Sequence, residues 1–254
     1  ADSTLSGGTA DTGGSFAFTT SSTKPNAGTG SQGVTFTPDD GNNYTTATTS
    51  VSVTVNAAGA TVSLSGLSQT YDGTAKGVTV GTVPSALGTS VTYDGSTNRP
   101  TNAGSYTVVA SVVDANYTGS TTNTLTINKA TPVITVAPTA SAITYGQTLA
   151  DSTLSGGTAD TGGSFAFTTP STKPGAGTGS QGVTFTPSDT NNYTTATTSV
   201  SVTVNAAGAT VSLSGLSQTY DGTAKGVTVT TTPSGLSNTV TYNGSTNLPV
   251  NAGS

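Results

Sequence analysis

The stretch SVSVTV at residues 50–55 decides the fold class of this chain. Apolar and hydroxyl side chains alternate along it with a period of two, the pattern of a strand with one buried face and one solvated face. The same alternation occurs in five other short stretches, at residues 61–64, 105–108, 133–136, 164–167 and 182–185. Turn signals such as Asp94-Gly95 and Asn243-Gly244 separate these stretches. Short strands at this spacing predict small antiparallel sheets that close over a core.

The strand pattern belongs to a long internal repeat. Residues 1–105 return as residues 150–254 with 13 substitutions and no gap, which is a period of 149 residues. A fainter period of 73 to 76 residues lies inside it, marked by an Asn-Tyr-Thr cassette and by a Thr-Tyr pair. The cassette contains Tyr44, Tyr117 and Tyr193, and the pair contains Tyr71, Tyr145 and Tyr220. Such landmarks indicate two related modules, A and B, that alternate along an array.

We place the module boundaries after each terminal strand. The predicted modules are A1 (1–56, lacking its first strands), B1 (57–130), A2 (131–206) and B2 (207–254, lacking its last strands). The linkers between the modules, such as residues 56–60 and 128–132, are too short to act as flexible tethers and favour stacked modules. We therefore expect a semi-rigid rod cut from a longer chain. The predicted fold is all-β, with tandem small antiparallel β-sandwich (Ig-like) modules in a rod; small β-grasp-like modules are the alternative.

Composition narrows the class of protein further. The chain has no Cys, His, Met, Trp or Glu, 59 Thr residues, and a charged fraction of 7%, against roughly 25% in ordinary soluble domains. Because strong helix formers are scarce, we expect helices to be absent or to consist of a single turn. A thinly spread net charge of −5 argues against a nucleic-acid or anionic-membrane partner. No apolar run approaches a membrane span, and a chain without thiols suits an extracellular location.

Catalysis is close to excluded by the available side chains. General acid–base and nucleophilic chemistry usually need His, Glu or Cys, and all three are missing. We therefore predict a protein that is not an enzyme, with no catalytic, cofactor-binding or metal-ligating residues and no cofactor.

One loop nevertheless has the composition of a calcium site. Residues 39–43 read DDGNN, which concentrates oxygen ligands of the kind that Ca²⁺ prefers. The second copy, residues 188–192, reads SDTNN and loses one carboxylate. We favour a plain Asx turn and expect folding to need no divalent metal.

Other recurring residues also have a structural and a functional interpretation. We expect the six recurring tyrosines to be core rings with tied hydroxyls rather than exposed binding platforms. Glycosylation sequons occur at Asn43, Asn116, Asn192 and Asn243, but three of them belong to the Asn-Tyr-Thr cassette and so look structural. Four lysines repeat in register, and their turn-like or strand-edge contexts disfavour covalent Lys–Asn cross-links: Lys24, Lys76, Lys173 and Lys225.

These motifs resemble two families of bacterial surface repeats. Module B, with YDGT at residues 71–74 and 220–223 and NAGSYTV at 102–108, resembles the YDG domain. Module A, with ITYGQTL at 143–149 and NNY at 191–193, resembles the MBG repeat of YGX type. The resemblance implies a segment of a very long secreted, adhesin-like bacterial protein, and it implies no ligand and no catalytic residue.

Two functional hypotheses follow. The first is a structural stalk or self-assembling fibre on the cell surface, whose partners are neighbouring repeats in a longer chain or a homopolymeric filament. The second is an adhesive module that contacts a surface or glycan ligand through repeated loops. Nine of the 13 substitutions fall within residues 81–101 of module B, which is a tolerant loop region or a diversified contact surface. Ice binding by a threonine-rich face is a further alternative that we disfavour, because it would need rows of Thr aligned at the spacing of neighbouring strands.

Overall fold

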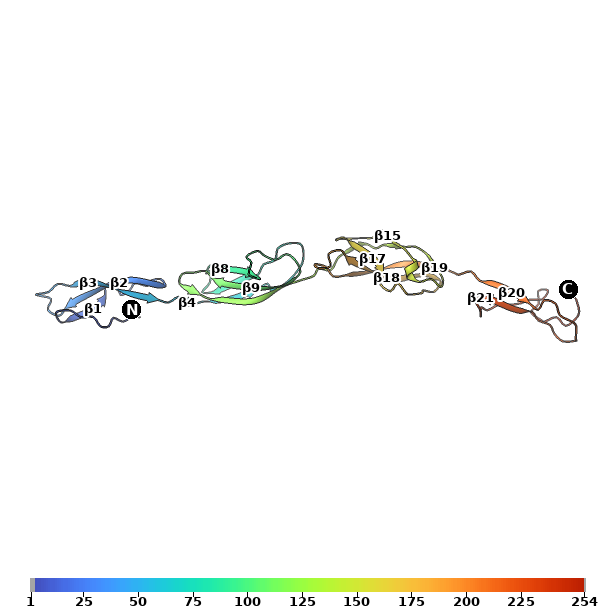
Figure 1. The fold of residues 1–254 in the computed structure, drawn as a ribbon, viewed down its shortest axis with the longest axis horizontal. Helices are drawn as coiled ribbons and strands as arrows, with labels where there is room; N and C mark the ends of the chain where they lie inside the picture. Colours follow the sequence, from blue (N-terminus) through green and yellow to red (C-terminus); the bar gives the residue numbers. More distant parts are fainter. Residues whose placement is uncertain (1–2, 254) are drawn as a thin grey trace. The chain divides into compact units, whose positions relative to one another are not determined.

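The structure, a computed structural model, describes residues 3–253 and is all-β (Figure 1). Within that range the helical content is one turn of 3₁₀ helix, η1 (Leu149–Asp151), which confirms the predicted class. No helix among the described residues is long and apolar enough to cross a membrane. The chain divides into two compact units, with residues 1–131 and 189–194 in unit 1 and residues 132–188 and 195–254 in unit 2.

Module A1, in unit 1, is one antiparallel sheet of three strands. It consists of β1 (Gly14–Phe18), β2 (Gly28–Pro38) and β3 (Ala47–Val55), in the order β1-β2-β3. Val34 and Phe36 on β2 are buried, and the Phe16 and Phe36 rings pack with their centroids 4.9 Å apart. Every second residue of β2 faces inward from Gln32 to Pro38, whereas on β3 only Val53 and Val55 are half-buried.

Module B1 is a two-layer sandwich. Its strands are β4 (Ala58–Gly59), β5 (Thr61–Ser65), β6 (Ser68–Thr70), β7 (Thr79–Val83), β8 (Thr89–Tyr93), β9 (Gly104–Val112), β10 (Tyr117–Thr118) and β11 (Ser120–Asn128). The sheet β6-β11-β9-β8 faces the antiparallel pair β5-β7, because β5 contacts both β9 and β11. Tyr93, Val108, Leu125 and Ile127 form the buried core between the layers.

Module A2 contains the same three long strands as A1, together with five short strands and one turn of 3₁₀ helix. Its elements are β12 (Ile134–Val136), β13 (Thr139–Ala140), β14 (Ile143–Thr144), η1, β15 (Leu154–Ser155), β16 (Thr158–Ala159), β17 (Gly163–Phe167), β18 (Gly177–Pro187) and β19 (Ala196–Asn205). The main sheet has the order β14-β19-β18-β17, and β12-β16 and β13-β15 form two small pairs. Its core contains Ile143, Leu149 and Phe167, with Val183 and three valines of β19.

Module B2 is described as a single hairpin of β20 (Thr210–Ser214) and β21 (Thr228–Thr232), followed by turns up to residue 253. Leu213, Leu216 and Val211 are exposed here, whereas Leu64, the counterpart of Leu213 in B1, packs against a core.

The long strands pair antiparallel, as predicted, and short parallel pairs are added to them. β6 pairs with β11, β14 pairs with β19, and β4 pairs with β10, all in parallel. In each complete module a short strand crosses from one layer to the other and runs along the last long strand of the main sheet. Parallel neighbours cannot be joined by a tight turn, and several strands indeed lie between the two members of each parallel pair in the chain. The four module boundaries stay predictions, although every sheet lies within one predicted range.

Candidate functional site

The linker between modules A1 and B1 is itself a strand. β4 pairs with β10, and the main chain is held by Ala58 N–H donating to the Asn116 carbonyl and Ala60 N–H donating to the Thr118 carbonyl, both at 2.8 Å. Because the residues of β10 belong to the Asn-Tyr-Thr cassette, the cassette fixes the linker of its own module. We call this arrangement the first joint.

The side chain of Asn116 extends the first joint to module A1. Its Oδ1 accepts a 2.7 Å hydrogen bond from Ala27 N–H, and its Nδ2 lies 3.3 Å from Asn26 Oδ1. The Asp114 carboxylate accepts the Asn116 N–H at 2.7 Å, which fixes the turn that carries the amide. One amide therefore satisfies a donor and an acceptor of a turn about 90 residues away.

The same joint occurs a second time in unit 1, where loop 189–194 meets module B1. Asn192 Oδ1 accepts Ala103 N–H at 2.7 Å, and Asn192 Nδ2 lies 3.3 Å from Asn102 Oδ1. The main chain of Asn192 and Thr194 pairs with Ala130 in the linker. The linker bond of Ala58 and both amide contacts recur in the second joint, whereas the bond of Ala60 has no counterpart because the equivalent residue is Pro132, which has no N–H. The joint is thus a repeated feature rather than a local accident.

Two further contacts support the second joint. Lys129 Nζ donates to the Thr190 carbonyl at 2.7 Å, and the Tyr71 and Tyr193 rings meet edge to face with centroids 5.3 Å apart. An edge-to-face pair of this kind contributes about 0.5–1.5 kcal/mol beyond the area it buries.

The candidate calcium loop is an Asx turn, and in its second copy the same turn holds the joint amide of Asn192. Asp40 Oδ1 accepts the N–H groups of Asn42 and Asn43 at 3.2 Å, and Asp40 Oδ2 accepts Asn43 Nδ2 at 2.7 Å. Asp189 holds Asn191 and Asn192 in the same way. These hydrogen bonds, led by the asparagine side chain, lower the pKa of both carboxyl groups. Asp39, which is replaced by Ser188 in the second copy, contributes no side-chain hydrogen bond to this turn.

The prediction that the recurring tyrosines lie in the core was wrong for three of them. Tyr44, Tyr145 and Tyr220 are 53%, 59% and 62% exposed. Tyr71, Tyr117 and Tyr193 are half-buried. Tyr71 packs against the B1 core, and its ring also meets Tyr193 from another module. The buried ring with a tied hydroxyl is Tyr93, whose Oη accepts Val78 N–H at 3.1 Å. Tyr93 follows an ordinary strand alternation, so its sequence offered no separate signal.

The sequon asparagines in the cassette have structural roles at both joints. Asn116 and Asn192 use their amide groups in the bonds described above, and Asn192 is buried.

Two of the four repeated lysines form ion pairs with aspartates rather than contacts with asparagines. Lys76 pairs with Asp72, and Lys225 pairs with Asp221.

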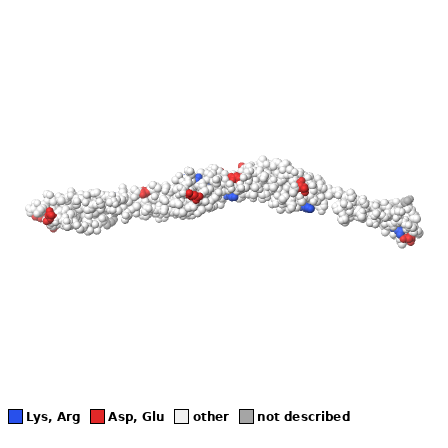
Figure 2. Space-filling model, in the orientation of Figure 1, with Lys and Arg blue, Asp and Glu red and all other residues white. Residues whose placement is uncertain are grey.

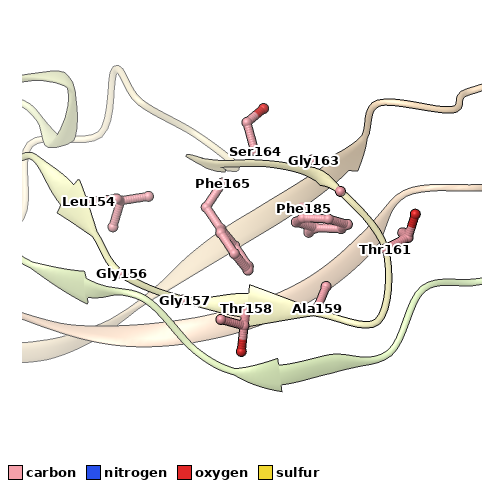
Figure 3. A pocket seen from close by; sticks show the side chains of 11 residues that line it. Leu154, Gly156, Gly157, Thr158, Ala159, Thr161, Gly163, Ser164, Phe165 and Phe185 are labelled. Carbon is pink, nitrogen blue, oxygen red and sulfur yellow. The ribbon is translucent and has the colours of Figure 1, made fainter.

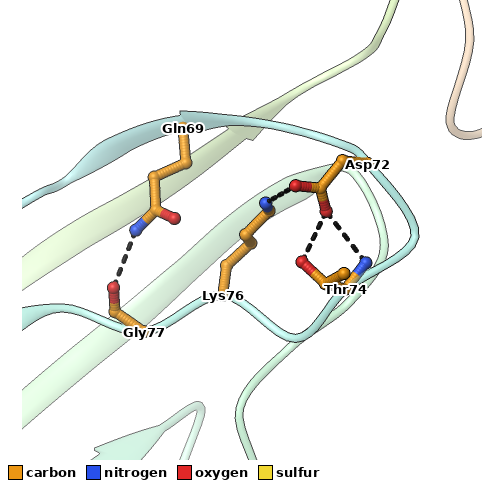
Figure 4. A network of polar contacts seen from close by, with 5 residues as sticks. All are labelled: Gln69, Asp72, Thr74, Lys76 and Gly77. Atoms are coloured by element: carbon orange, nitrogen blue, oxygen red, sulfur yellow. Dashed lines mark hydrogen bonds and ion pairs between the residues drawn. The ribbon is translucent and has the colours of Figure 1, made fainter.

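The YDGT motif forms a compact polar turn (Figure 4). Asp72 accepts Thr74 Oγ1 at 2.6 Å and Thr74 N–H at 2.9 Å, and it pairs with Lys76. Gln69 Nε2 donates to the Gly77 carbonyl at 2.7 Å across the base of the turn. The Lys76 ammonium and the Thr74 hydroxyl hold the pKa of the Asp72 carboxyl well below its usual range, and Lys225 and Thr223 lower that of Asp221.

These depressed pKa values predict an acid-sensitive turn. A carboxyl group whose folded pKa lies below the ordinary value of 3.8 stabilises the fold above that pH, and the contribution is lost as the pH falls through the folded pKa. The thermal unfolding midpoints of the parent chain and of Asp72→Asn should therefore differ most at pH 6, and the difference should shrink as the pH falls below 3.8 toward 2. Asp11→Asn, at an exposed carboxylate outside this turn, is the charge control. A constant difference across this range would contradict the assignment.

A shallow pocket lies on module A2, in unit 2 (Figure 3). It has a volume of about 380 Å³ and is lined by Leu154, residues 156–159 and 161–165, and Phe185. The Phe165 and Phe185 rings face it with their centroids 4.9 Å apart. Its lining supplies hydroxyl groups and ring edges but no ionisable side chain. Figure 2 shows that charged side chains on the visible face occur as few, separate spots.

Part of the chain is similar to a known protein family. The MBG domain family matches residues 60–131 and 209–254, which cover most of modules B1 and B2. The resemblance of these modules to the YDG domain, and of module A to the YGX-type repeat, stays a prediction.

Known proteins show only distant likeness. One similar solved structure is Drosophila N-cadherin EC1-4, with 12% identity over 72% of this chain and 60% of that one and a TM-score of 0.20. Another is protocadherin gamma B2 extracellular cadherin domains 1–5, with 12% identity over 70% of this chain and 46% of that one and a TM-score of 0.22. A third is an endo-fucoidan hydrolase from glycoside hydrolase family 107, with 14% identity over 79% of this chain and 38% of that one and a TM-score of 0.21. The chain thus spans 38% to 60% of the length of these structures. No curated protein matches the chain significantly.

Proposed function

We propose that this chain is a non-catalytic structural segment of a long extracellular bacterial surface protein, in which MBG-type repeats form a stalk or a self-assembling fibre. The observation that carries the proposal is the joint, which occurs twice in unit 1 with the same donor and acceptor atoms. A repeated joint whose amide is positioned in advance by an aspartate suits an element that must hold successive modules in one arrangement.

The geometry of the joint explains how it would serve a stalk. A free linker would behave as a swivel, but β4 is paired along its length to β10 and has no slack. The Asn116 amide adds a contact beyond the linker, on the turn of module A1. Force or orientation is then transmitted through several hydrogen bonds at once, each contributing about 0.5–1.5 kcal/mol.

The sparse surface charge is consistent with the same role. A chain with 7% charged residues gives little long-range steering toward a charged partner. Hydroxyl-rich strands instead pair across the sheets, as in the Thr29–Thr54 and Thr178–Thr203 contacts at 2.9 and 3.1 Å.

The test is the shape of the chain in solution with and without the joints. A stalk segment of this length should give a radius of gyration of about 30 Å by small-angle scattering, against about 18 Å for a compact globule of the same size. The double variant Asn116→Ala/Asn192→Ala should broaden the distance distribution and shorten its maximum, because both joint amides are lost.

The matched control is Asn191→Ala, which removes the neighbouring amide of the same turn and leaves Asn192 in place. A globule-like radius for the parent chain would overturn the stalk proposal, and unchanged scattering from the double variant would show that the amides do not hold the joints. Antibody labelling of intact cells tests the surface location, and an image of the native assembly separates a single stalk from a packed fibre.

One observation favours adhesion as a second function. In module B1, eight of the nine positions substituted within residues 81–101 are exposed, all except Thr101. Exposed variation of this kind suits a diversified contact surface as well as a tolerant loop. Binding of one copy but not the other to a surface or glycan ligand would support adhesion.

A further inference from the structure

The two B modules contain the same tight turn with one chemical difference. In B1 the turn is Asp94-Gly95, and in B2 it is Asn243-Gly244. In both modules the first residue has a φ of 47° and the glycine has a φ of 83°, the left-handed conformation of a two-residue β-hairpin turn. The sequence contains no second Asn-Gly pair.

The hydrogen bonds that close and anchor this turn also match. In B1, Tyr93 and Ser96 exchange two main-chain hydrogen bonds, of 2.7 and 2.9 Å. In B2, Tyr242 and Ser245 exchange two, of 2.7 and 3.0 Å. Each tyrosine hydroxyl also accepts a main-chain N–H of its own module, at 3.1 Å in B1 and 2.9 Å in B2. The turn therefore has one structure whether its first residue is aspartate or asparagine.

The two groups that can react with each other in an Asn-Gly pair are accessible at this turn. Asn243 and Gly244 are exposed, and so is the counterpart Asp94 in module B1. The hydrogen bonds of the hairpin join the residues on either side, Tyr242 and Ser245, so they do not engage the Gly244 N–H. Glycine has no Cβ, which leaves the approach to its main-chain nitrogen unhindered.

We propose that Asn243 is a site of spontaneous deamidation, and that module B accepts the aspartate product in the turn that B1 already has. The main-chain nitrogen of Gly244 attacks Cγ of Asn243, the bond from Cγ to Nδ2 breaks, and Nδ2 leaves as ammonia with the proton of the Gly244 N–H. One solvent water then opens the cyclic imide and leaves a carboxylate. The reaction also removes the sequon at Asn243, because the amide nitrogen is the group that would carry a glycan.

Module B1 shows how the aspartate product is held. Asp94 Oδ1 accepts Thr107 N–H at 2.7 Å, and Asp94 N–H donates to the Thr107 carbonyl at 2.8 Å, so the carboxylate ties the turn to β9. A hydrogen bond to an ionised acceptor is roughly twice as strong as a neutral one. Opening of the imide at its other carbonyl gives isoaspartate, which adds a carbon to the main chain and does not fit a two-residue turn. The folded turn therefore favours aspartate over isoaspartate.

The experiment incubates the full 254-residue chain in mildly alkaline buffer and follows deamidation by peptide mass mapping. Conversion of one asparagine adds about 1 Da, and fragmentation of the peptide assigns the gain to its residue. We expect the gain at Asn243. Asn247 is an exposed asparagine of the same peptide that Leu248 follows, and it should convert at least about tenfold more slowly, because a side chain on the following residue hinders ring closure.

Gly244→Ala should slow conversion at Asn243 by at least about tenfold, because the added Cβ hinders the attacking nitrogen. The methyl group would meet no atom within 4 Å, but the φ of 83° is strained for alanine. A turn loosened by this strain would bring the reacting groups together more often, so loosening cannot account for a slower rate.

Asp94→Asn is the matched chain variant, because it places an Asn-Gly pair in the B1 turn. Deamidation to aspartate restores the parent sequence there, so the product peptide elutes with the parent peptide, whereas the isoaspartyl peptide separates from it. We expect a larger share of aspartate from the folded variant than from the same variant unfolded in urea.

Three results would overturn the assignment of the site: no gain at Asn243 while a free peptide of residues 240–247 converts, an equal gain at Asn247, or conversion of Gly244→Ala at the parent rate. Equal shares of aspartate from folded and unfolded Asp94→Asn would overturn the claim that the turn accepts the product.

Discussion

Leu149→Ala should destabilise module A2 by about 2–5 kcal/mol, the usual cost of truncating a fully buried leucine. Leu149 is completely buried against the valines of β19. Its removal would open the core of A2 and expose Val200 and Val202 to solvent. Leu154→Ala, at a half-buried position that packs against the same cluster, is the matched control and should cost clearly less.

Hydrogen exchange followed by mass spectrometry can measure this loss in one module. β18 repeats β2 letter for letter, so peptides from the strand alone cannot be assigned to a copy. Peptides that span residues 170 and 175 can be assigned, because these are Pro and Gly in A2 and Ser21 and Asn26 in A1. We expect faster exchange only in the A2 peptides. Equal exchange in the parent and the variant would show that Leu149 does not hold the core.

Gly163→Ala should destabilise A2 by about 1–3 kcal/mol, the usual penalty for overpacking a close contact. A methyl group at Gly163 would overlap both the Phe185 ring and the Thr186 carbonyl oxygen, because β17 crosses the ring at van der Waals distance. The preceding residue gives a matched control, since a methyl group at Gly162 would meet only Ser188 Oγ, at 3.9 Å. Gly162→Ala should therefore be nearly neutral.

Thermal unfolding of the two glycine variants, monitored by circular dichroism and calorimetry, checks this prediction. The lower-melting variant should be Gly163→Ala, and its loss should appear in the transition that Leu149→Ala also moves. If both alanines cost the same, the close approach of β17 to Phe185 is not the reason that glycine is needed there.

The period-two alternation was sufficient to predict the long strands. All six predicted stretches overlap strands of the structure, because apolar residues at every second position can be buried only on a pleated face. The Asp94-Gly95 turn was equally plain, since both residues adopt positive φ. Local sequence carries these features, and so they could be predicted one stretch at a time.

The edge strands and the joints could not be predicted in this way. β14 has two residues, too few to show a period, and it exists because Ile143 fills a space defined by β17 and β19. The Asn-Tyr-Thr cassette was visible as a recurrence, but the partner of Asn116 is the N–H group of Ala27, a main-chain group that every residue type except proline carries. Recurrence suggested burial for the tyrosines, whereas the rings of Tyr71 and Tyr193 are positioned by pairing across a joint.

The identity of the A1 and A2 strands has a consequence for folding. Interchangeable strands in one chain invite exchange between modules, a characteristic failure of repeat proteins. Placing a B module between two A modules doubles the separation of identical strands from about 75 to 149 residues, which raises the entropic cost of a swapped pairing by only about 0.6 kcal/mol. Pairing with a B module costs more, because Gln69 and Ala75 stand where module A has the buried Ile143 and Leu149, and two apolar side chains of about 1.5–3 kcal/mol each would be missing. Alternation therefore protects the growing chain mainly by making each nearest neighbour the wrong partner.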